Sequence, residues 1–321
     1  MKRRKNNGYK TLFAFALTIC AGAAAFLYGT YAYVFRVFKA QRKDDGYFKK
    51  RSNLSDEEKT LYSWMAELSE HEHENVEITS YDGTKLCGKY YHVSDNAPLE
   101  IAFHGYRSLA ERDFCGGAKI CFDNGINLLT VDQRAHGNSG GNTLTFGIKE
   151  RYDCLEWAKY ASERFGNDIK IILAGVSMGA ATVLMASDLD LPENVVGIIA
   201  DCPYSSPEEI IKKVCKDKKL PVNIFYPAVK TGAKLFGKFD LEEDGAQKSA
   251  QNAKVPVLLI HGLADGFVPH EMSESIFGAC SSDRTLLEVP EADHARSYLV
   301  NKELYEKTVL EFINKCCKKT L

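Results

Sequence analysis

The stretch IILAGVSMG, residues 171–179, decides the fold. Its first residues form an apolar, partly β-branched run that predicts a buried strand, and small residues behind it begin a helix. The turn between them reads Gly-x-Ser-x-Gly. A sharp strand-to-helix turn of this kind holds its serine in strained backbone geometry and exposes the hydroxyl above the sheet. We therefore predict Ser177 as a nucleophile, with Gly175 and Gly179 at positions where side chains would collide with neighbouring elements.

Seven further short apolar runs flank this strand, and predicted helices alternate with most of them. Strands that alternate with helices indicate a mostly parallel sheet with helices on both faces. The sequence thus predicts an α/β fold with an eight-stranded sheet. The expected strands are Val76–Ser80, Leu86–His92, Leu99–Phe103, Ile126–Asp132, Ile169–Ala174, Val195–Ala200, Val255–His261 and Thr285–Val289.

A serine hydroxyl is a weak nucleophile until a base takes its proton, and the partners should follow in the order acid, then histidine. Asp265 follows the predicted strand 255–261, and His294 follows the last predicted strand. Both lie at the carboxyl edge of the sheet, where open α/β folds place ligand sites. Asp293 is an alternative carboxylate, although a direct sequence neighbour would orient the histidine poorly.

Negative charge that develops on a substrate oxygen needs hydrogen-bond donors aimed at it. The backbone N–H of Met178, directly after the serine, is one candidate. We expect the second from the loop after Leu99–Phe103, with the N–H of Tyr106 as the choice. On that loop, His104 and Gly105 are expected to support the turn.

With these motifs in order, the sequence from residue 76 onward resembles the α/β-hydrolase superfamily. Within it, the chain is similar to bacterial membrane-anchored hydrolases related to the serine aminopeptidase and monoglyceride-lipase-like group. DQRAHGNS at residues 132–139 is similar to a loop of that group that usually reads D-x-R-G-H-G, so Ala135 departs from the pattern. The resemblance implies an α/β-hydrolase fold with a short helical cap.

The resemblance also implies serine-dependent acyl transfer to water, with an acyl-enzyme at Ser177, His294 as base and then acid, and Asp265 fixing the imidazole tautomer. No cofactor and no metal is expected. An esterase or lipase-like enzyme that cleaves a carboxylic ester or thioester of a small or lipid-like acyl group is the main hypothesis. A serine aminopeptidase-type peptidase and a membrane-tethered binding protein without chemistry remain alternatives. A peptidase needs an acidic group for the substrate ammonium, and the sequence offers Glu208, Glu209 and Glu242.

The N-terminal part divides into a basic tail at 1–10, an uncharged apolar run at 11–35, and a charged connector with an amphipathic helix at 36–75. The run is long enough to cross a hydrocarbon core of about 30 Å as a helix, which predicts a single-pass membrane anchor. A cleaved signal is the alternative, because residues 21–25 resemble A-x-A cleavage sites. Basic residues flank both ends of the run, so the side of the membrane that holds the 76–321 domain stays open.

The interval 207–254 lacks a strand and predicts a helical cap insertion. Residues 207–240 carry eight lysines against four acidic residues, interleaved with aromatic and aliphatic side chains. This pattern suits a surface that meets anionic lipid, or else a solvated face over a packed core. The whole chain has 41 basic and 43 acidic side chains, which disfavours a nucleic-acid partner.

Overall fold

The computed structural model of the protein describes residues 3–40 and 54–318. A single eight-stranded sheet runs in the order β1-β2-β4-β3-β5-β6-β7-β8. β2 pairs antiparallel with both β1 and β4, and the remaining neighbours are parallel. The predicted mostly parallel sheet is therefore confirmed. The strands are β1 (Glu74–Thr79), β2 (Lys85–Tyr91), β3 (Leu99–Phe103), β4 (Asn127–Asp132), β5 (Ile171–Val176), β6 (Val195–Asp201), β7 (Val257–Gly262) and β8 (Arg284–Val289).

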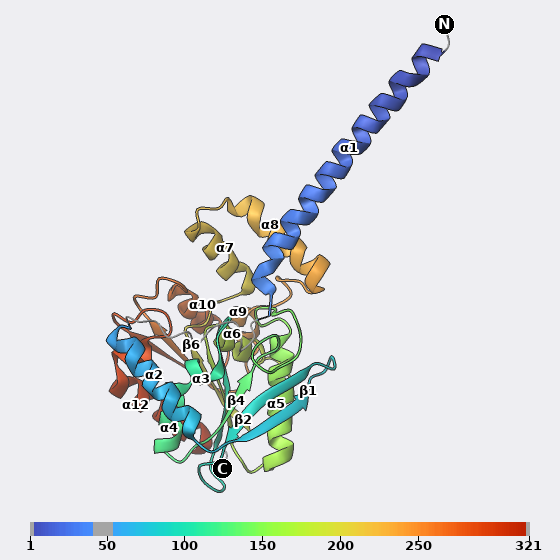
Figure 1. Ribbon diagram of the computed structural model, residues 1–321. Coiled ribbons are helices and arrows are strands. Elements are labelled where there is room, and N and C mark those ends of the chain that lie inside the picture. The colour runs from blue at the N-terminus through green and yellow to red at the C-terminus, as the bar shows by residue number, and fades with distance from the viewer. Residues whose placement is uncertain (1–2, 41–53, 319–321) are drawn as a thin grey trace.

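Helices cover both faces of the sheet, as Figure 1 shows. The helices packed around the sheet, here called the body, are α2 (Asp56–Glu70), α3 (Ala110–Asp113), α4 (Cys115–Asp123), α5 (Glu150–Phe165), α6 (Met178–Met185), α9 (Ala246–Ala250), α10 (Glu271–Ala279), α11 (Ser297–Val300) and α12 (Lys302–Lys318). One face packs against α5, α6, α9 and α10, and the other against α2, α4, α11 and α12. Successive residues of each strand contribute to the two faces in turn, because their side chains point to opposite sides of the sheet.

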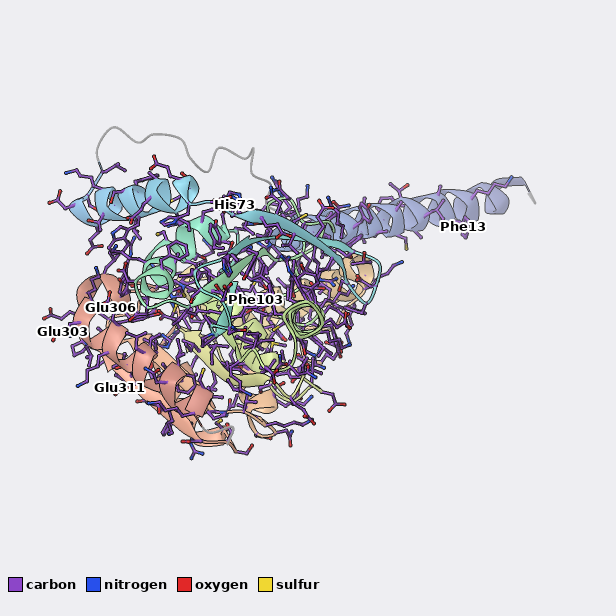
Figure 2. The ribbon with its side chains drawn as sticks, turned by 90° about the horizontal axis from the view of Figure 1, so that it is seen from below. Phe13, His73, Phe103, Glu303, Glu306 and Glu311 are labelled. Atoms are coloured by element: carbon purple, nitrogen blue, oxygen red, sulfur yellow. The ribbon has the colours of Figure 1, made fainter. Side chains whose placement is uncertain are left out.

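The strand that leads into the Ser177 turn, β5, and its neighbour β3 are wholly buried, so the turn rests on a rigid base. All residues of β3 and β5 are buried. In register, Phe103 lies beside Gly175, and Val176 lies beside Asp201. Figure 2 places Phe103 in the middle of the molecule. The ends of β3, β5 and β6 therefore meet at one place at the carboxyl edge of the sheet.

The strand-free interval after β6 is helical, as expected for a cap. It contains α7 (Pro207–Asp217), α8 (Val222–Gly232) and η2 (Ala233–Gly237), and the segment then returns to the body through α9. α7 is amphipathic, with Ser206 accepting a hydrogen bond from the Glu209 N–H at its start. We refer to residues 207–239 as the cap.

The N-terminal run forms the long helix α1 (Arg3–Val34), which continues into the short helix η1 (Phe35–Phe38) and stands out from the body beside α8 (Figures 1 and 2). Phe13–Phe38 is long and apolar enough to cross a membrane, and none of its best window is buried by protein. Tyr28 and Phe35 both contact the cap residue Phe236 through ring centroids 5.7 and 5.5 Å apart.

The residues that follow α1 pack on the body, although the sequence suggested that a connector begins at residue 36. Phe38 is completely buried and makes edge-to-face contacts with Phe146 and Phe239. Lys39 forms a β-bridge with Thr143. The later part of the expected connector, residues 41–53, lies outside the described residues. α2 then begins at the predicted N-cap Ser55 with the capping box to Glu58.

Candidate active site

Ser177 occupies the sharp turn between β5 and α6. Its backbone has φ +55° and ψ −111°, a conformation that costs a non-glycine residue about 1–3 kcal/mol. Both glycines of the motif are sterically required. A Cβ on Gly175 would lie 2.3 Å from the carbonyl carbon of Gly179, and one on Gly179 would lie 1.8 Å from the carbonyl oxygen of Phe103. The turn can therefore form only with this glycine pattern.

The structure brings the three predicted side chains of the site together. His294 Nε2 lies 3.0 Å from Ser177 Oγ, and His294 Nδ1 lies 2.7 Å from Asp265 Oδ2. The carboxylate accepts the Nδ1 proton, which leaves Nε2 with a lone pair for the serine hydroxyl. The histidine side chain is 22% exposed and the Asp265 side chain is fully buried. A hydroxyl, an imidazole and a carboxylate thus form one continuous hydrogen-bond chain.

Both carboxylate oxygens of Asp265 accept hydrogen bonds. Oδ1 accepts the N–H groups of Phe267 and Val268 at 2.9 and 2.8 Å, and Oδ2 lies 3.2 Å from His261 Nε2. Burial alone raises the pKa of this carboxyl, but the hydrogen bonds from His261 and His294 outweigh it and hold the pKa well below its usual range. Asp265 therefore stays ionised beside the imidazole.

Asp293, the alternative carboxylate, does not contact the imidazole of His294 through any hydrogen bond or ion pair recorded for residues 54–318. Its Oδ1 accepts the backbone N–H groups of Gly266 and His294, at 3.1 and 2.7 Å. Asp293 thereby ties together the two loops that carry Asp265 and His294.

The loop after β3 lies beside the nucleophile. A Cβ on Gly105 would lie 3.4 Å from the Cβ of Ser177. The N–H groups of Tyr106 and Met178, predicted as oxyanion donors, have no acceptor within the described parts of the chain. His104 supports this loop from beneath: its Nε2 accepts the Gln133 N–H at 3.1 Å, so its Nδ1 carries the proton and donates to the Gly105 carbonyl at 2.8 Å.

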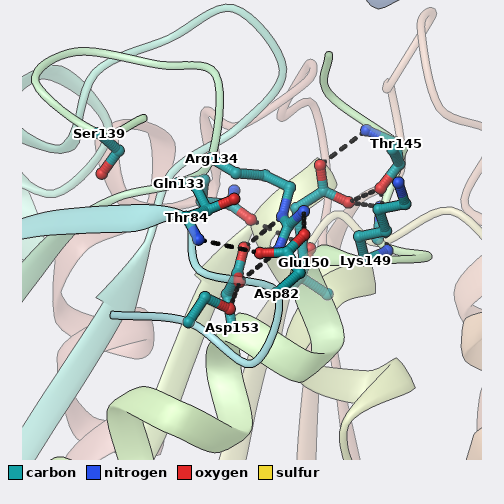
Figure 3. Close-up of polar contacts among 12 residues, drawn as sticks. Asp82, Thr84, Gln133, Arg134, Ser139, Thr145, Lys149, Glu150 and Asp153 are labelled. Carbon is teal, nitrogen blue, oxygen red and sulfur yellow. Dashed lines mark hydrogen bonds and ion pairs between the residues drawn. The ribbon is translucent and has the colours of Figure 1, made fainter. Parts of the chain in front are cut away.

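The loop after β4 holds the loop after β3 in place. His136 Nε2 accepts the N–H of Arg107 at 3.1 Å, where Arg107 has a positive φ of 50°. Arg134 anchors its own loop through ion pairs to Asp153 on α5 and Asp82 in the β1–β2 turn, and Figure 3 shows these contacts. Ala135 has φ +62°, a left-handed conformation that glycine adopts at lower cost than alanine.

Two further contacts to this loop were not predicted from the sequence. Asp113 on α3 accepts the Gly105 N–H at 2.7 Å and the Ser108 hydroxyl at 2.6 Å. On the outer side, the Tyr106 hydroxyl donates to the carbonyl of Val37 at 2.7 Å. The segment after α1 is thus hydrogen-bonded directly to the residue predicted as an oxyanion donor.

A cleft of about 330 Å³ opens at Ser177 and His294 and continues along the sheet face that carries α4 and α12. Leu61 and Trp64 of α2 line it, together with Tyr298 of α11. Of the described residues that line this cleft, none belongs to the cap. The sequence suggested a cap over the carboxyl edge but gave no sign that α2 takes part in the site.

Three polar side chains line the deeper part of the cleft and were not predicted: Glu100 on β3, Asp201 at the end of β6, and Tyr305 on α12. Glu100 and Asp201 are 5% and 6% exposed. An acidic residue inside the otherwise apolar run 99–103 is the one sequence signal that could have indicated Glu100.

One group of side chains has the chemistry of metal ligands: Cys202, Asp265 and His294, with ligand atoms within 4.8 Å of one another. Burial raises the pKa of the Cys202 thiol well above its usual range, which disfavours the thiolate that binds metals. Asp265 and His294 are already engaged with each other. We assign no metal to this group.

Comparisons with known proteins point to an α/β-hydrolase fold. The family model described as serine aminopeptidase, S33 matches residues 99–239. The uncharacterized protein YqkD of Bacillus subtilis is 29% identical over 61% of this chain and 64% of its own length, so the chain spans less than two thirds of that relative. The thiohydrolase aneE of Aspergillus aculeatus is 31% identical over 40% of this chain and 41% of its own length.

Among solved structures, the Pyrococcus furiosus esterase Pf2001 aligns with a TM-score of 0.62 and 25% identity, covering 84% of this chain and 98% of the esterase. The sheet order, the strained serine turn and these matches lead to one classification. The chain belongs to the α/β-hydrolase superfamily.

Proposed function

We propose that the protein is a serine hydrolase that cleaves carboxylic ester or thioester bonds of small or lipid-like acyl groups. The observation that carries this proposal is the continuous hydrogen-bond chain from Ser177 through His294 to Asp265 at the mouth of the cleft. The esterase and thiohydrolase among the similar proteins support the same reaction class.

In the first half of the reaction, Ser177 Oγ attacks the substrate carbonyl carbon while His294 Nε2 takes the hydroxyl proton. The carbonyl oxygen becomes an oxyanion, stabilised by the N–H groups of Met178 and Tyr106. Asp265 holds Nδ1 and stabilises the imidazolium. When the intermediate collapses, the bond to the leaving alcohol or thiol breaks and His294 returns the proton to it.

In the second half, water attacks the acyl-enzyme and gives a proton to His294 Nε2. Collapse of that intermediate breaks the bond to Ser177 Oγ, and the same proton returns to the serine. The products are a carboxylic acid and the regenerated enzyme, so no redox partner or metal is required by this chemistry.

The peptidase alternative receives little support from Glu208, Glu209 and Glu242, the acids that the sequence offered for it. Glu208 and Glu209 form ion pairs with Lys212, and Glu242 pairs with Lys230. None of these three carboxylates lines the cleft among the residues that the structure describes. They are therefore poor candidates for holding a substrate ammonium next to Ser177.

We further propose that α1 is retained as a single-pass anchor and places the catalytic domain at a membrane surface. Its apolar surface is unburied, and it is continuous with the buried residue Phe38. Contacts of Tyr28 and Phe35 with Phe236 tie the end of α1 to the cap. These contacts lie beyond the A-x-A-like sites at residues 21–25 and position only the end of α1. The apolar run that continues past those sites is what supports a retained helix.

The test is covalent labelling of the full chain in detergent with a fluorophosphonate, which reacts with activated serines. We expect labelling of the wild type, none of Ser177→Ala, and at least about a 1,000-fold slower reaction of His294→Gln, because removal of a triad histidine lowers kcat about a million-fold. Ser187→Ala is the matched control, because Ser187 is buried just after α6 and no described residue forms a hydrogen bond with its Oγ.

Labelling that persists in Ser177→Ala would show that another residue is the nucleophile. A panel of p-nitrophenyl esters, acyl thioesters and aminoacyl amides then identifies the bond cleaved. Faster turnover of the amides than of the matched esters would show that the protein is a peptidase and would overturn the esterase proposal.

A further inference from the structure

The cleft beyond Ser177 contains a polar site that the proposed mechanism does not use. Asp201 Oδ2 accepts a hydrogen bond from the Tyr305 hydroxyl at 3.0 Å. Asp201 Oδ1 is buried and has no partner among the described residues. A buried carboxylate oxygen without a donor is unfavourable, and native sites with such an atom usually have a ligand or water to satisfy it.

The position of Asp201 links this site to the reaction. Its own carbonyl oxygen accepts the N–H of Ser177 at 2.8 Å, and it lies in register with Val176. Its side chain points to the sheet face along which the cleft runs, because Ile199, two residues earlier, also lines the cleft. The unpartnered oxygen is therefore close to the scissile bond of any substrate at Ser177.

Glu100 extends the same polar surface deeper into the cleft. In register, Glu100 lies beside Ile172, and Asp201 lies beside Val176. Ile172 and Val176 are four residues apart on β5, so the two acids are offset by about 13 Å along the strand direction. Between the two acids the lining is apolar, with Ala174, Ile199 and Val309. The cleft thus offers an acceptor near the nucleophile, an apolar stretch, and a second acidic group beyond it.

The charges at this end of the cleft favour a ligand group that donates hydrogen bonds. No lysine or arginine forms an ion pair with Asp201 or Glu100 in the described parts of the chain. Burial raises the pKa of the Asp201 carboxyl to about 6 and that of the Glu100 carboxyl to about 7. Asp201 is therefore mainly ionised at neutral pH and accepts hydrogen bonds only.

We propose that Asp201 and Tyr305 form a subsite for a hydrogen-bond donor, a hydroxyl or an ammonium, on the acyl group of the substrate, with Glu100 available to a longer acyl chain. This proposal rests on the proposed hydrolase function and narrows its substrate class to acyl groups that carry such a donor. Plain alkanoyl esters then bind the cleft less well, because they leave Asp201 Oδ1 unsatisfied.

The experiment compares p-nitrophenyl butanoate with the matched 3-hydroxybutanoyl and 3-aminobutanoyl esters on the full chain. We expect kcat/KM of the wild type to favour at least one donor-bearing ester by about tenfold or more, and the two donor esters show whether the group is a hydroxyl or an ammonium. Asp201→Asn and Tyr305→Phe should lower this ratio about tenfold. The ratio is the readout because a general loss of activity does not change it.

Tyr298→Phe is the matched control. Tyr298 also lines the cleft, but its hydroxyl donates to Glu306 instead of to Asp201, so its removal should leave the ratio unchanged. A wild-type ratio near one for both donor esters overturns the subsite. So does a ratio that Asp201→Asn leaves intact.

A second measurement needs no turnover. 1,3-Butanediol or 3-aminobutan-1-ol should slow fluorophosphonate labelling of the wild type, and raise its melting temperature, more than 1-butanol does. Equal effects of all three ligands contradict the subsite. Absence of labelling altogether overturns the hydrolase proposal instead, and the melting temperatures then still decide whether the donor site exists.

Discussion

At the residue scale, the site depends on how buried charges are satisfied. Asp265 receives donors from two histidines and two backbone N–H groups, and the pKa of its carboxyl is accordingly low. Glu100 and Asp201 line the same cleft but form no ion pair with a lysine or arginine of the described residues, and burial raises the pKa of both carboxyls. Burial of these two carboxyls therefore lowers the free energy of unfolding.

Glu100 gives a test of this cost. Its carboxyl has a pKa of about 7 because burial disfavours the charge, whereas an unfolded glutamate titrates near 4.5. Between these values the folded state binds the extra proton, so the free energy of unfolding falls as pH rises through this window. The loss amounts to about 3 kcal/mol and is complete above pH 7, by the usual conversion of a pKa shift.

Glu100→Gln should remove this loss. Urea unfolding at pH 5 and pH 8 should show a smaller drop for the variant than for the wild type, because the amide does not titrate. Glu311→Gln, at an exposed position on α12, serves as the control and should follow the wild type. Equal drops for all three proteins would mean that Glu100 does not titrate in this range.

The residues of the hydrogen-bond chain could be predicted from the sequence because each follows a strand and strand order limits where it can lie. Ser177, Asp265 and His294 needed only the motif order. Asp201 and Tyr305 could not be found this way. Their pairing joins positions 104 residues apart through side chains of β6 and α12, and neither residue carries a motif.

At the element scale, the loop after β3 is held from three sides. The loop after β4 supplies His136, α3 supplies Asp113, and the segment after α1 supplies the carbonyl of Val37. The first support follows from the motif at residues 132–139. The third was missed because residues 36–40 read as a polar connector, although Phe38 is as deeply buried as any core residue.

Phe38→Ala tests this third support. Phe38 packs edge-to-face on Phe146, whose ring stacks on Tyr106 at 5.2 Å, so its loss opens a cavity behind the candidate oxyanion donor. We expect a loss of about 3–5 kcal/mol in the free energy of unfolding. We also expect a fall in kcat that exceeds any rise in KM, because the role proposed for the Tyr106 N–H is to stabilise the transition state.

Val37→Ala is the matched control for that measurement. Its side chain is 37% exposed, and the substitution keeps the carbonyl that accepts the Tyr106 hydroxyl. Urea unfolding and ester hydrolysis of both variants in detergent give the comparison. Full kcat in Phe38→Ala, with only stability reduced, would confine the role of this segment to packing.

At the scale of the whole molecule, the cap and α1 form one surface. α1 stands out beside α8, and η2 contacts the end of α1 through Phe236 (Figure 1). A bilayer that contains α1 therefore lies near the cap. On this surface Ile224 and Leu235 are 63% and 60% exposed, which is unusual for large aliphatic side chains in water.

Ion pairs already engage half of the lysines of the cap. Four of its eight lysines form ion pairs, namely Lys212, Lys213, Lys230 and Lys234. Within the described residues, the other four have no ion pair: Lys216, Lys218, Lys219 and Lys238. Three of those lie together at the α7–α8 turn, so any attraction to anionic lipid should concentrate there.

Reversing these three charges tests the lipid contact. In vesicles that contain phosphatidylserine, the full-length variant Lys216→Glu, Lys218→Glu, Lys219→Glu should show an apparent KM for a lipid ester at least about tenfold higher than the wild type, since each lysine near an anionic surface contributes about 1 kcal/mol. In phosphatidylcholine vesicles, or at high salt, the two proteins should behave alike. The triple reversal of Lys307, Lys315 and Lys318 on α12, away from the cap, is the control for net charge. If both triple variants raise KM equally, or neither does, these lysines are a solvated face and α1 alone brings the enzyme to the membrane.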